Sequence, residues 1–147
     1  MEKELLEHVY PGNKEGEREI QTRQCSPLVL AYIGDAVFEV FSRTKVVVHH
    51  HGPVHRLHNQ SKEYVKASAQ AQMVQCLQPH LTEEEKSIIR RGRNAKSHSM
   101  PKNAELMDYK IATGLEALVG YLYLEGQIDR LEELIQLGFS YLEQTVH

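Results

Sequence analysis

The sequence is poor in features that would place it in several well-known classes of protein. It has no Trp and only two cysteines, Cys25 and Cys76, which form no CxxC motif, so we expect free thiols in a reducing cytosol. The charged N-terminus, Met1-Glu2-Lys3-Glu4, leads into no apolar signal core, and no stretch approaches the ~18 apolar residues of a membrane span. We therefore expect a cytoplasmic protein with no membrane partner.

Common enzyme motifs are also missing. No Gly-x-Ser-x-Gly nucleophile elbow and no Gly-x-x-x-x-Gly-Lys phosphate loop occurs, although composition alone leaves a Ser/His/Asp triad open. Histidines cluster between His49 and His58, but Gly52-Pro53 interrupts the element that carries them. Zinc ligands usually lie close together on one rigid turn or helix face, so we expect a solvated helix end here instead of a metal site.

The length and composition of the chain are typical of one soluble globular domain. It has 147 residues, of which 41% are hydrophobic and 25% charged, and its net charge is −3. The charge is segregated along the chain. Residues 86–110 hold seven Lys and Arg side chains against two carboxylates, a net +5, whereas residues 111–147 hold one Arg against six carboxylates, a net −5.

The periodic stretches all favour helices, so we expect an all-α fold. Residues 1–24 are predicted to be a polar extension with a short helix over Lys3–His8. Ser26-Pro27 is a helix start and Gly52-Pro53 a stop, and Thr82 to Glu85 forms a capping box for a helix that Gly92 should end. In residues 25–147 we predict helices at 27–49, 59–77, 82–91, 104–125 and 127–143. The expected core positions of the first are Leu30, Ile33, Val37, Val40 and Phe41.

Two of these helices each carry one carboxylate among small and apolar residues. Asp35 is expected to be buried in the first, and Glu116 lies in the fourth. The small residues beside them would let the two helices cross closely and bring both carboxylates to one point, which suits a hard divalent cation such as Mg²⁺. A structural pair bonded to Lys, Arg or Tyr is the alternative. Glu39 stands four residues before Arg43, so we expect a solvated ion pair there.

A basic stretch between two predicted helices, residues 91–103, has no apolar period and is expected to be a loop. Its Gly and Ser residues leave backbone N–H groups accessible, and its cations can track phosphates. Lys66 and Ser68 could also reach a phosphate, with a solvated helix face as the equal alternative. The phosphate-binding candidates are Arg91, Arg93, Asn94, Lys96, Lys102, Lys66 and Ser68.

Two motifs in this chain resemble those of one enzyme family. Residues 30–38 (LAYIGDAVF) resemble the ribonuclease III signature LEFLGDSVL, and residues 113–120 (TGLEALVG) resemble that family's second motif, DTVEALIG. The resemblance covers residues 27–143 and implies the helical ribonuclease III endonuclease fold, with Asp35 and Glu116 binding Mg²⁺ or, as an alternative, Mn²⁺. It also implies a homodimer that cleaves double-stranded RNA and leaves 5′-phosphate and 3′-hydroxyl ends.

The chain departs from the family pattern at two positions. Ala31 stands where the first motif has glutamate, and Thr113 stands where the second has aspartate, so waters must replace two carboxylates. The chain also lacks the double-stranded-RNA-binding domain that usually follows. With these departures and its basic loop, the chain resembles the Mini-III branch of the family. That resemblance implies a role in the maturation of 23S ribosomal RNA precursors.

The resulting hypothesis is a Mg²⁺-dependent endoribonuclease in which Asp35 and Glu116 hold the metal and Thr113 orients a metal-bound water. A-form RNA is read largely through its shape and phosphates, so the basic loop would supply the RNA contacts. One rival is a double-stranded-RNA-binding or ribosome-assembly factor that has lost catalysis. The other is a helical scaffold in which Asp35 and Glu116 only anchor helix packing.

Overall fold

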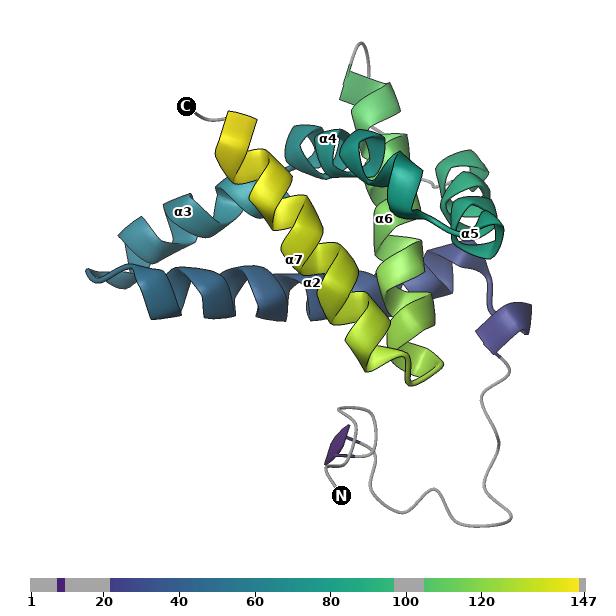
Figure 1. Ribbon diagram of the computed structural model, residues 1–147, viewed down its shortest axis with the longest axis horizontal. Coiled ribbons are helices and arrows are strands. Elements are labelled where there is room, and N and C mark those ends of the chain that lie inside the picture. Colours follow the sequence, from purple (N-terminus) through teal and green to yellow (C-terminus); the bar gives the residue numbers. More distant parts are fainter. Residues whose placement is uncertain (1–7, 10–21, 97–104, 146–147) are drawn as a thin grey trace.

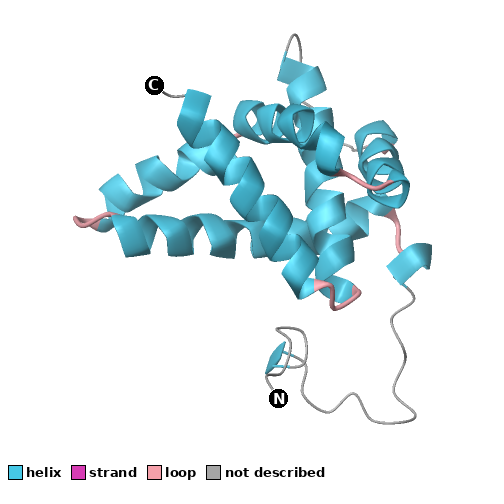
Figure 2. Cartoon of the chain, in the orientation of Figure 1, coloured by secondary structure: helices cyan, strands magenta, loops and turns pink. Residues whose placement is uncertain are grey.

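Helices form every regular element that the computed structural model describes, which comprises residues 8–9, 22–96 and 105–145 (Figures 1 and 2). The elements run in the order η1 (Thr22–Gln24), α2 (Pro27–His49), α3 (Val54–Val65), α4 (Ala67–Leu77), η2 (Gln78–His80), α5 (Glu83–Asn94), α6 (Glu105–Leu124) and α7 (Ile128–Thr145). The all-α prediction is confirmed. None of the described helices is long and apolar enough to cross a membrane.

Helix α6 is the centre of the fold, with α2, α4, α5 and α7 packed around it (Figure 1). The second half of α6 is buried on every side except at Glu116, because apolar and small residues follow one another from Leu115 to Tyr123. The side chains of Phe38, Met73, Leu118, Leu131 and Phe139 are fully buried around it. Position 139 was not among the predicted core residues.

The crossing of α2 and α6 is as close as two helices allow. A Cβ atom added at Gly34 would overlap the carbonyl oxygen of Glu116, and one added at Gly120 would overlap the carbonyl oxygen of Leu30. The two backbones are therefore in direct contact, as the small residues of both motifs predicted. This contact places Asp35, next to Gly34, opposite Glu116.

Helix α5 meets α6 through a second pair of glycines, and this corrects one predicted boundary. We expected Gly92 to end the helix, but α5 continues to Asn94. Gly92 is buried because its α-carbon lies against Gly114, where an added Cβ would stand 2.8 Å from the Gly114 Cα. The glycine serves close packing there. Arg91, Arg93 and Asn94 consequently lie on the last turn of a helix and not in a loop.

The predicted helix over 59–77 is in fact two helices. α3 begins at Val54, directly after Pro53, and Lys66 has extended backbone angles (φ −62°, ψ 150°) that separate α3 from α4. The Gln70 side chain donates a hydrogen bond of 3.1 Å to the carbonyl oxygen of Val65, which satisfies an acceptor that the break leaves open. No Pro or Gly marks this break, so periodicity alone joined the two helices.

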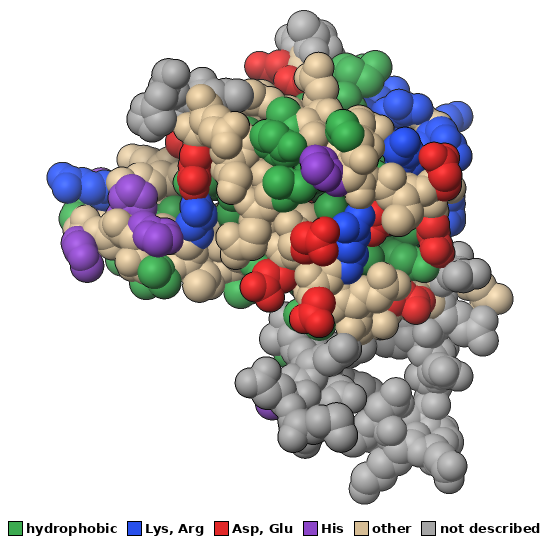
Figure 3. Space-filling view, in the orientation of Figure 1, with side chains coloured by type: hydrophobic (Ala, Val, Ile, Leu, Met, Phe, Trp, Pro, Cys, Tyr) green, Lys and Arg blue, Asp and Glu red, His purple; other side chains and the backbone are tan. Residues whose placement is uncertain are grey.

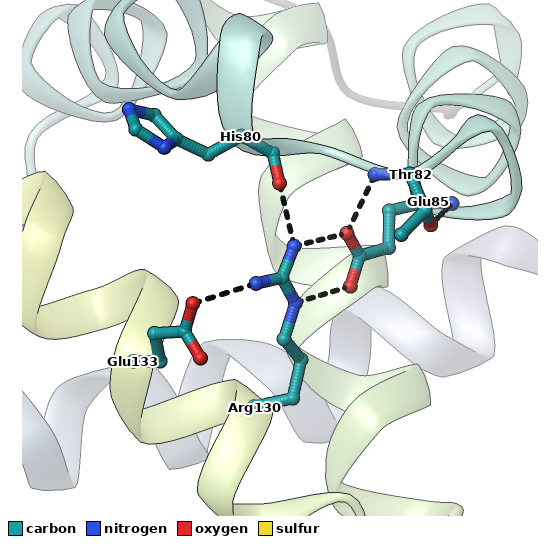
Figure 4. Close-up of polar contacts among 5 residues, drawn as sticks. All are labelled: His80, Thr82, Glu85, Arg130 and Glu133. Atoms are coloured by element: carbon teal, nitrogen blue, oxygen red, sulfur yellow. Dashed lines mark hydrogen bonds and ion pairs between the residues drawn. The ribbon is translucent and has the colours of Figure 1, made fainter.

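A charged cluster fixes α7 against η2 and α5 (Figure 4). The Arg130 guanidinium donates to both carboxylate oxygens of Glu85 at 2.9 and 2.8 Å, and to the His80 carbonyl oxygen at 2.6 Å. Burial alone would raise the pKa of Glu85, but hydrogen bonds from Arg130 and Thr82, with the Arg130 charge, outweigh it and lower that pKa. Glu85 also completes the predicted capping box with Thr82 at the start of α5.

Candidate functional site

The two motif carboxylates line one cavity between α2 and α6. Its volume is about 440 Å³. From α2 it takes Asp35 and the neighbouring positions Leu28, Ala31, Tyr32, Ile33 and Ala36, and from α6 it takes Tyr109, Thr113 and Glu116. The predicted convergence of Asp35 and Glu116 is therefore present, and Thr113 lies beside them.

The position of Asp35 differs from the one expected. Its side chain is exposed, as is that of Ala36, because the buried face of α2 passes through Leu30, Val37 and Phe38. Val40, another predicted core residue, is 61% exposed. A run of apolar residues on a helix covers more than one face, and here one apolar face of α2 points away from the core.

The pKa of Glu116 is raised from 4.5 to about 8. Burial is the largest cause, followed by a hydrogen bond with the Asp35 carboxyl and by the negative charges of Asp35 and Glu39. Glu39 itself accepts a hydrogen bond from Arg43 at 3.0 Å, which confirms the predicted ion pair. Because burial and the neighbouring negative charges both disfavour ionisation of Glu116, a cation bound beside Asp35 and Glu116 would stabilise the ionised pair.

The donor set suits a hard metal ion with few protein ligands. Within the described ranges, no group of three or more His, Cys, Asp or Glu side chains could hold a metal ion, so the site offers the pair Asp35 and Glu116. Mg²⁺ commonly takes one or two protein carboxylates and fills its octahedron with waters and substrate oxygens. The absence of a carboxylate at Ala31, whose small side chain lines the cavity, leaves room for those waters.

Thr113 already uses its proton within the protein. Its hydroxyl donates a hydrogen bond of 3.0 Å to the carbonyl oxygen of Tyr109, one turn earlier in α6. The oxygen therefore faces the cavity only as an acceptor. A metal-bound water donates hydrogen bonds, so this orientation is compatible with the water-orienting role expected for Thr113.

A second hollow lies on the other side of α6 and carries the opposite charge. This basic groove, of about 580 Å³, runs between α4, α5 and α6, and its cations are Lys86, Arg90 and Arg93. Ser68 lines it from α4 and Asp108 from α6, where the adjacent Tyr109 faces the carboxylate cavity. In Figure 3 the Lys and Arg side chains gather over the region of α5.

The groove places some of the predicted phosphate-binding residues together and separates others. Arg93 and Ser68 line it, whereas Arg91 and Asn94 lie elsewhere on the last turn of α5 and Lys96 follows that helix. Lys66 forms an exposed ion pair with Glu63 at 2.9 Å. Lys102 lies outside the described residues.

Lys86 and Arg90 line the groove but are not among the phosphate-binding residues predicted from the sequence. They share one helix face with Arg93, since their spacing is four and then three residues. That signal was readable from the sequence, but ending the helix at Gly92 hid it.

The chain is similar to known proteins in both sequence and structure. Residues 28–127 match the Ribonuclease III domain. The chain is 50% identical to a Mini-ribonuclease 3 of Thermoanaerobacter sp. (strain X514), with 81% of this chain and 84% of the relative aligned, and 48% identical to one of Symbiobacterium thermophilum, with 80% and 91% aligned. In structure it is similar to protein FN1578 from Fusobacterium nucleatum, with a TM-score of 0.71, 30% identity, and coverage of 80% of this chain and 94% of that one.

The match over residues 28–127 contains Asp35, Thr113 and Glu116, so the cavity lies inside the region that the chain shares with these enzymes. The chain belongs to the ribonuclease III family, in its mini-ribonuclease 3 branch, and is an endoribonuclease.

Proposed function

We propose that this endoribonuclease cleaves double-stranded RNA in a Mg²⁺-dependent reaction, with Asp35 and Glu116 holding the metal and Mn²⁺ as an alternative ion. The observation that carries the proposal is that both carboxylates face one cavity, where the pKa of Glu116 is raised to about 8 by burial and by Asp35. A cation bound between Asp35 and Glu116 would offset the repulsion between their negative charges.

The chemistry follows from what each group offers. A bound Mg²⁺ supplies a water of lowered pKa and positive charge for the scissile phosphate. The water oxygen bonds to phosphorus and the bond from phosphorus to the 3′ oxygen breaks. The attacking water loses one proton and the 3′ oxygen takes one up, so that the products carry 5′-phosphate and 3′-hydroxyl ends. Thr113 contributes an acceptor oxygen that orients a water in the cavity.

Duplex RNA fits the charge of the basic groove. Proteins read A-form RNA largely through its shape, its phosphates and its 2′-hydroxyl groups, because side chains cannot enter its narrow major groove. The three cations of the basic groove project from one face of α5, and Arg91 and Lys96 extend the positive charge around the end of that helix. These residues would bind phosphates on either side of the cut.

A homodimer is part of the proposal because α2 has an apolar face with no covering element among the described residues. This α2 stripe comprises Val29, Tyr32, Ala36, Val40 and Val47, and all five are exposed. The first four are spaced three or four residues apart, and Val47 follows two turns after Val40. Tyr32 is 82% exposed. Contiguous exposed apolar surface of this kind marks an interaction site. A second copy packed on it would lie beside the cavity, which Tyr32 and Ala36 also line.

The natural substrate we propose is a precursor of 23S ribosomal RNA, processed in the cytoplasm. The support is the similarity to mini-ribonuclease 3 proteins along most of the chain. The structure adds that the described helices supply both the carboxylate cavity and a basic groove, so the catalytic domain can make its own contacts to a duplex.

The test is to incubate the purified protein with a long RNA duplex and with precursor 23S RNA, in Mg²⁺ and in EDTA. We expect cleavage of both RNAs with Mg²⁺ and none with EDTA, and products that ligate as 5′-phosphates. Binding of the duplex without cleavage in Mg²⁺ would instead support the rival RNA-binding or ribosome-assembly factor. Sedimentation of the wild type and of a Tyr32→Glu, Val40→Glu variant tests the dimer, since charges in the α2 stripe should yield monomers.

A further inference from the structure

Two tyrosines line the carboxylate cavity in addition to the motif carboxylates. Tyr32 comes from the exposed stripe of α2, and Tyr109 comes from α6 and is partly buried. Tyr32 belongs to the surface proposed for the dimer, whereas Tyr109 has no part in the proposed reaction. Tyr109 lies on the same helix as Glu116 and is separated from it by two turns, so it belongs to the rigid part of the site.

Three tyrosine hydroxyls elsewhere in the described part of the molecule have protein partners, unlike that of Tyr109. The Tyr64 hydroxyl bonds Glu143 at 3.2 Å, that of Tyr141 bonds His80 at 3.1 Å, and that of Tyr121 donates to Glu84 at 2.7 Å. In the part of the chain that the structure describes, no hydrogen-bond partner is found for the Tyr109 hydroxyl. A phenol that lines a polar cavity without a protein partner is available to a ligand.

The position of Tyr109 along α6 decides which part of a substrate it can reach. Seven residues separate it from Glu116, which corresponds to about 10 Å along the helix axis. The scissile phosphate must lie at the carboxylates, so the phenol lies too far along the cavity to share that phosphate. The hydrogen bond from the Thr113 hydroxyl to the Tyr109 carbonyl ties this turn of α6 to the turn that holds Thr113.

The cavity also has room for more than a phosphate and a metal. Its volume of about 440 Å³ is within the range of pockets that enclose a small organic ligand, and Leu28 and Ile33 give it an apolar wall. A nucleotide next to the cut would therefore bring its sugar and phosphate past Tyr109 while the scissile phosphate meets Asp35 and Glu116.

We propose that Tyr109 is a substrate-positioning residue: its hydroxyl hydrogen-bonds a sugar or phosphate oxygen of the nucleotide adjacent to the scissile phosphate. This inference rests on the proposed function and adds to it a contact that sets where along the strand the cut falls. Because the contact is made to the bound substrate in the ground state as well as during reaction, it contributes to KM more than to kcat.

The test compares wild type with Tyr109→Phe, which keeps the ring and removes only the hydroxyl. Tyr141→Phe is the matched control, since its hydroxyl bonds His80 far from the cavity. We expect Tyr109→Phe to raise KM about 3- to 10-fold, the effect of one lost hydrogen bond, with kcat within about twofold. The control should match wild type.

A second arm identifies the substrate atom. Duplexes carry a single 2′-deoxynucleotide, or a single methylphosphonate, at each position within two nucleotides of the cut. At one position, the modified duplex should raise the KM of the wild type as much as the Tyr109→Phe substitution does, and it should not raise the KM of Tyr109→Phe any further. If that modification is the 2′-deoxynucleotide, the contact is to the sugar, and if it is the methylphosphonate, the contact is to the phosphate. Equal losses in both proteins at every position, or an unchanged KM for Tyr109→Phe, would overturn the inference.

Affinity for the same duplexes is measured in parallel without turnover, by fluorescence anisotropy. If the wild type fails to cleave, the proposed function fails, yet the binding data still decide whether Tyr109 contacts the RNA. The two failures are thus distinguishable.

Discussion

The two hollows on opposite sides of α6 differ in how they fix their charges. In the carboxylate cavity, Asp35 and Glu116 face each other because α2 and α6 touch backbone to backbone at Gly34 and Gly120. In the basic groove, Lys86, Arg90 and Arg93 project from one helix on flexible stems. The cavity therefore fixes the positions of its charged groups, whereas the groove supplies positive charge without fixing its position. Changes to the two carboxylates of the cavity should therefore act on the chemical step, and changes to the cations of the groove on affinity.

The largest expected effect comes from removing one charge of the cavity. Asp35→Asn or Glu116→Gln should lower the rate of Mg²⁺-dependent duplex cleavage by at least about 100-fold, because each removes half of the protein ligands proposed for the metal. Rates are measured in single turnover, with helix content from circular dichroism. Glu132→Gln, an exposed acid on α7, is the control and should be fully active. Retained cleavage in either cavity variant would favour the scaffold alternative.

The next effect tests whether backbone contact sets the cavity. Gly34→Ala places a methyl group on the Glu116 carbonyl, so it should destabilise the protein by about 2–4 kcal/mol despite the better helix propensity of Ala. Gly138→Ala is the matched control, since its methyl group would meet only the flexible end of Met73. Urea unfolding measures both. Equal stability of the two variants would show that α2 and α6 can separate at little cost.

The pH dependence of the free energy of unfolding tests the negative charge of the cavity. The folded-state pKa of Glu116, about 8, lies above its ordinary value of 4.5, so the folded protein binds this proton more tightly than the unfolded chain does. The contribution of Glu116 to the stability of the metal-free protein should therefore be complete below pH 4.5 and fall by about 1 kcal/mol per pH unit as pH rises from 5 to 8.

Thermal melts across that range in EDTA measure this slope, and Glu116→Gln should flatten it. Added Mg²⁺ should restore the melting temperature most at the high end of the range, because it binds the ionised pair. A wild-type slope that survives in Glu116→Gln would assign the titration to another group.

The smallest effects are expected in the groove. Alanine at Lys86, Arg90 and Arg93 should weaken duplex binding about 10-fold and reduce the slope of log affinity against log salt, while single-turnover cleavage at saturating RNA is kept. Alanine at Arg91, Arg93 and Lys96 tests three of the cations predicted from the sequence, and Lys62→Ala is the control. An unchanged salt slope for the first variant would remove the groove from the RNA-binding surface.

Local rules in the sequence predicted much of this molecule. The Ser26-Pro27 start of α2 is confirmed by a bond of 3.2 Å from the Leu28 N–H to the Ser26 hydroxyl, and the Thr82–Glu85 capping box has both of its hydrogen bonds. The small residues of the two motifs predicted the close crossing. Each of these signals depends on neighbours in the chain or on a contact that only Gly permits.

The failures all depend on tertiary context. Gly92 looked like a stop because its packing partner, Gly114, is distant in sequence. The break at Lys66 has no Pro or Gly to mark it. Asp35 was expected inside and is exposed, since the pattern of α2 does not tell which of its two apolar faces meets the core. The basic groove requires three helices and could not be derived from any one of them.

The backbone contact at Gly34 and Gly120 also has a meaning for redesign. Because no side chain separates α2 from α6 there, repacking the core cannot easily change the spacing of Asp35 and Glu116. The crossing acts as a fixed template onto which further ligands can be added one at a time. Restoring an acid at Thr113 or Ala31, which both line the cavity, would alter the number of carboxylates while leaving the frame in place.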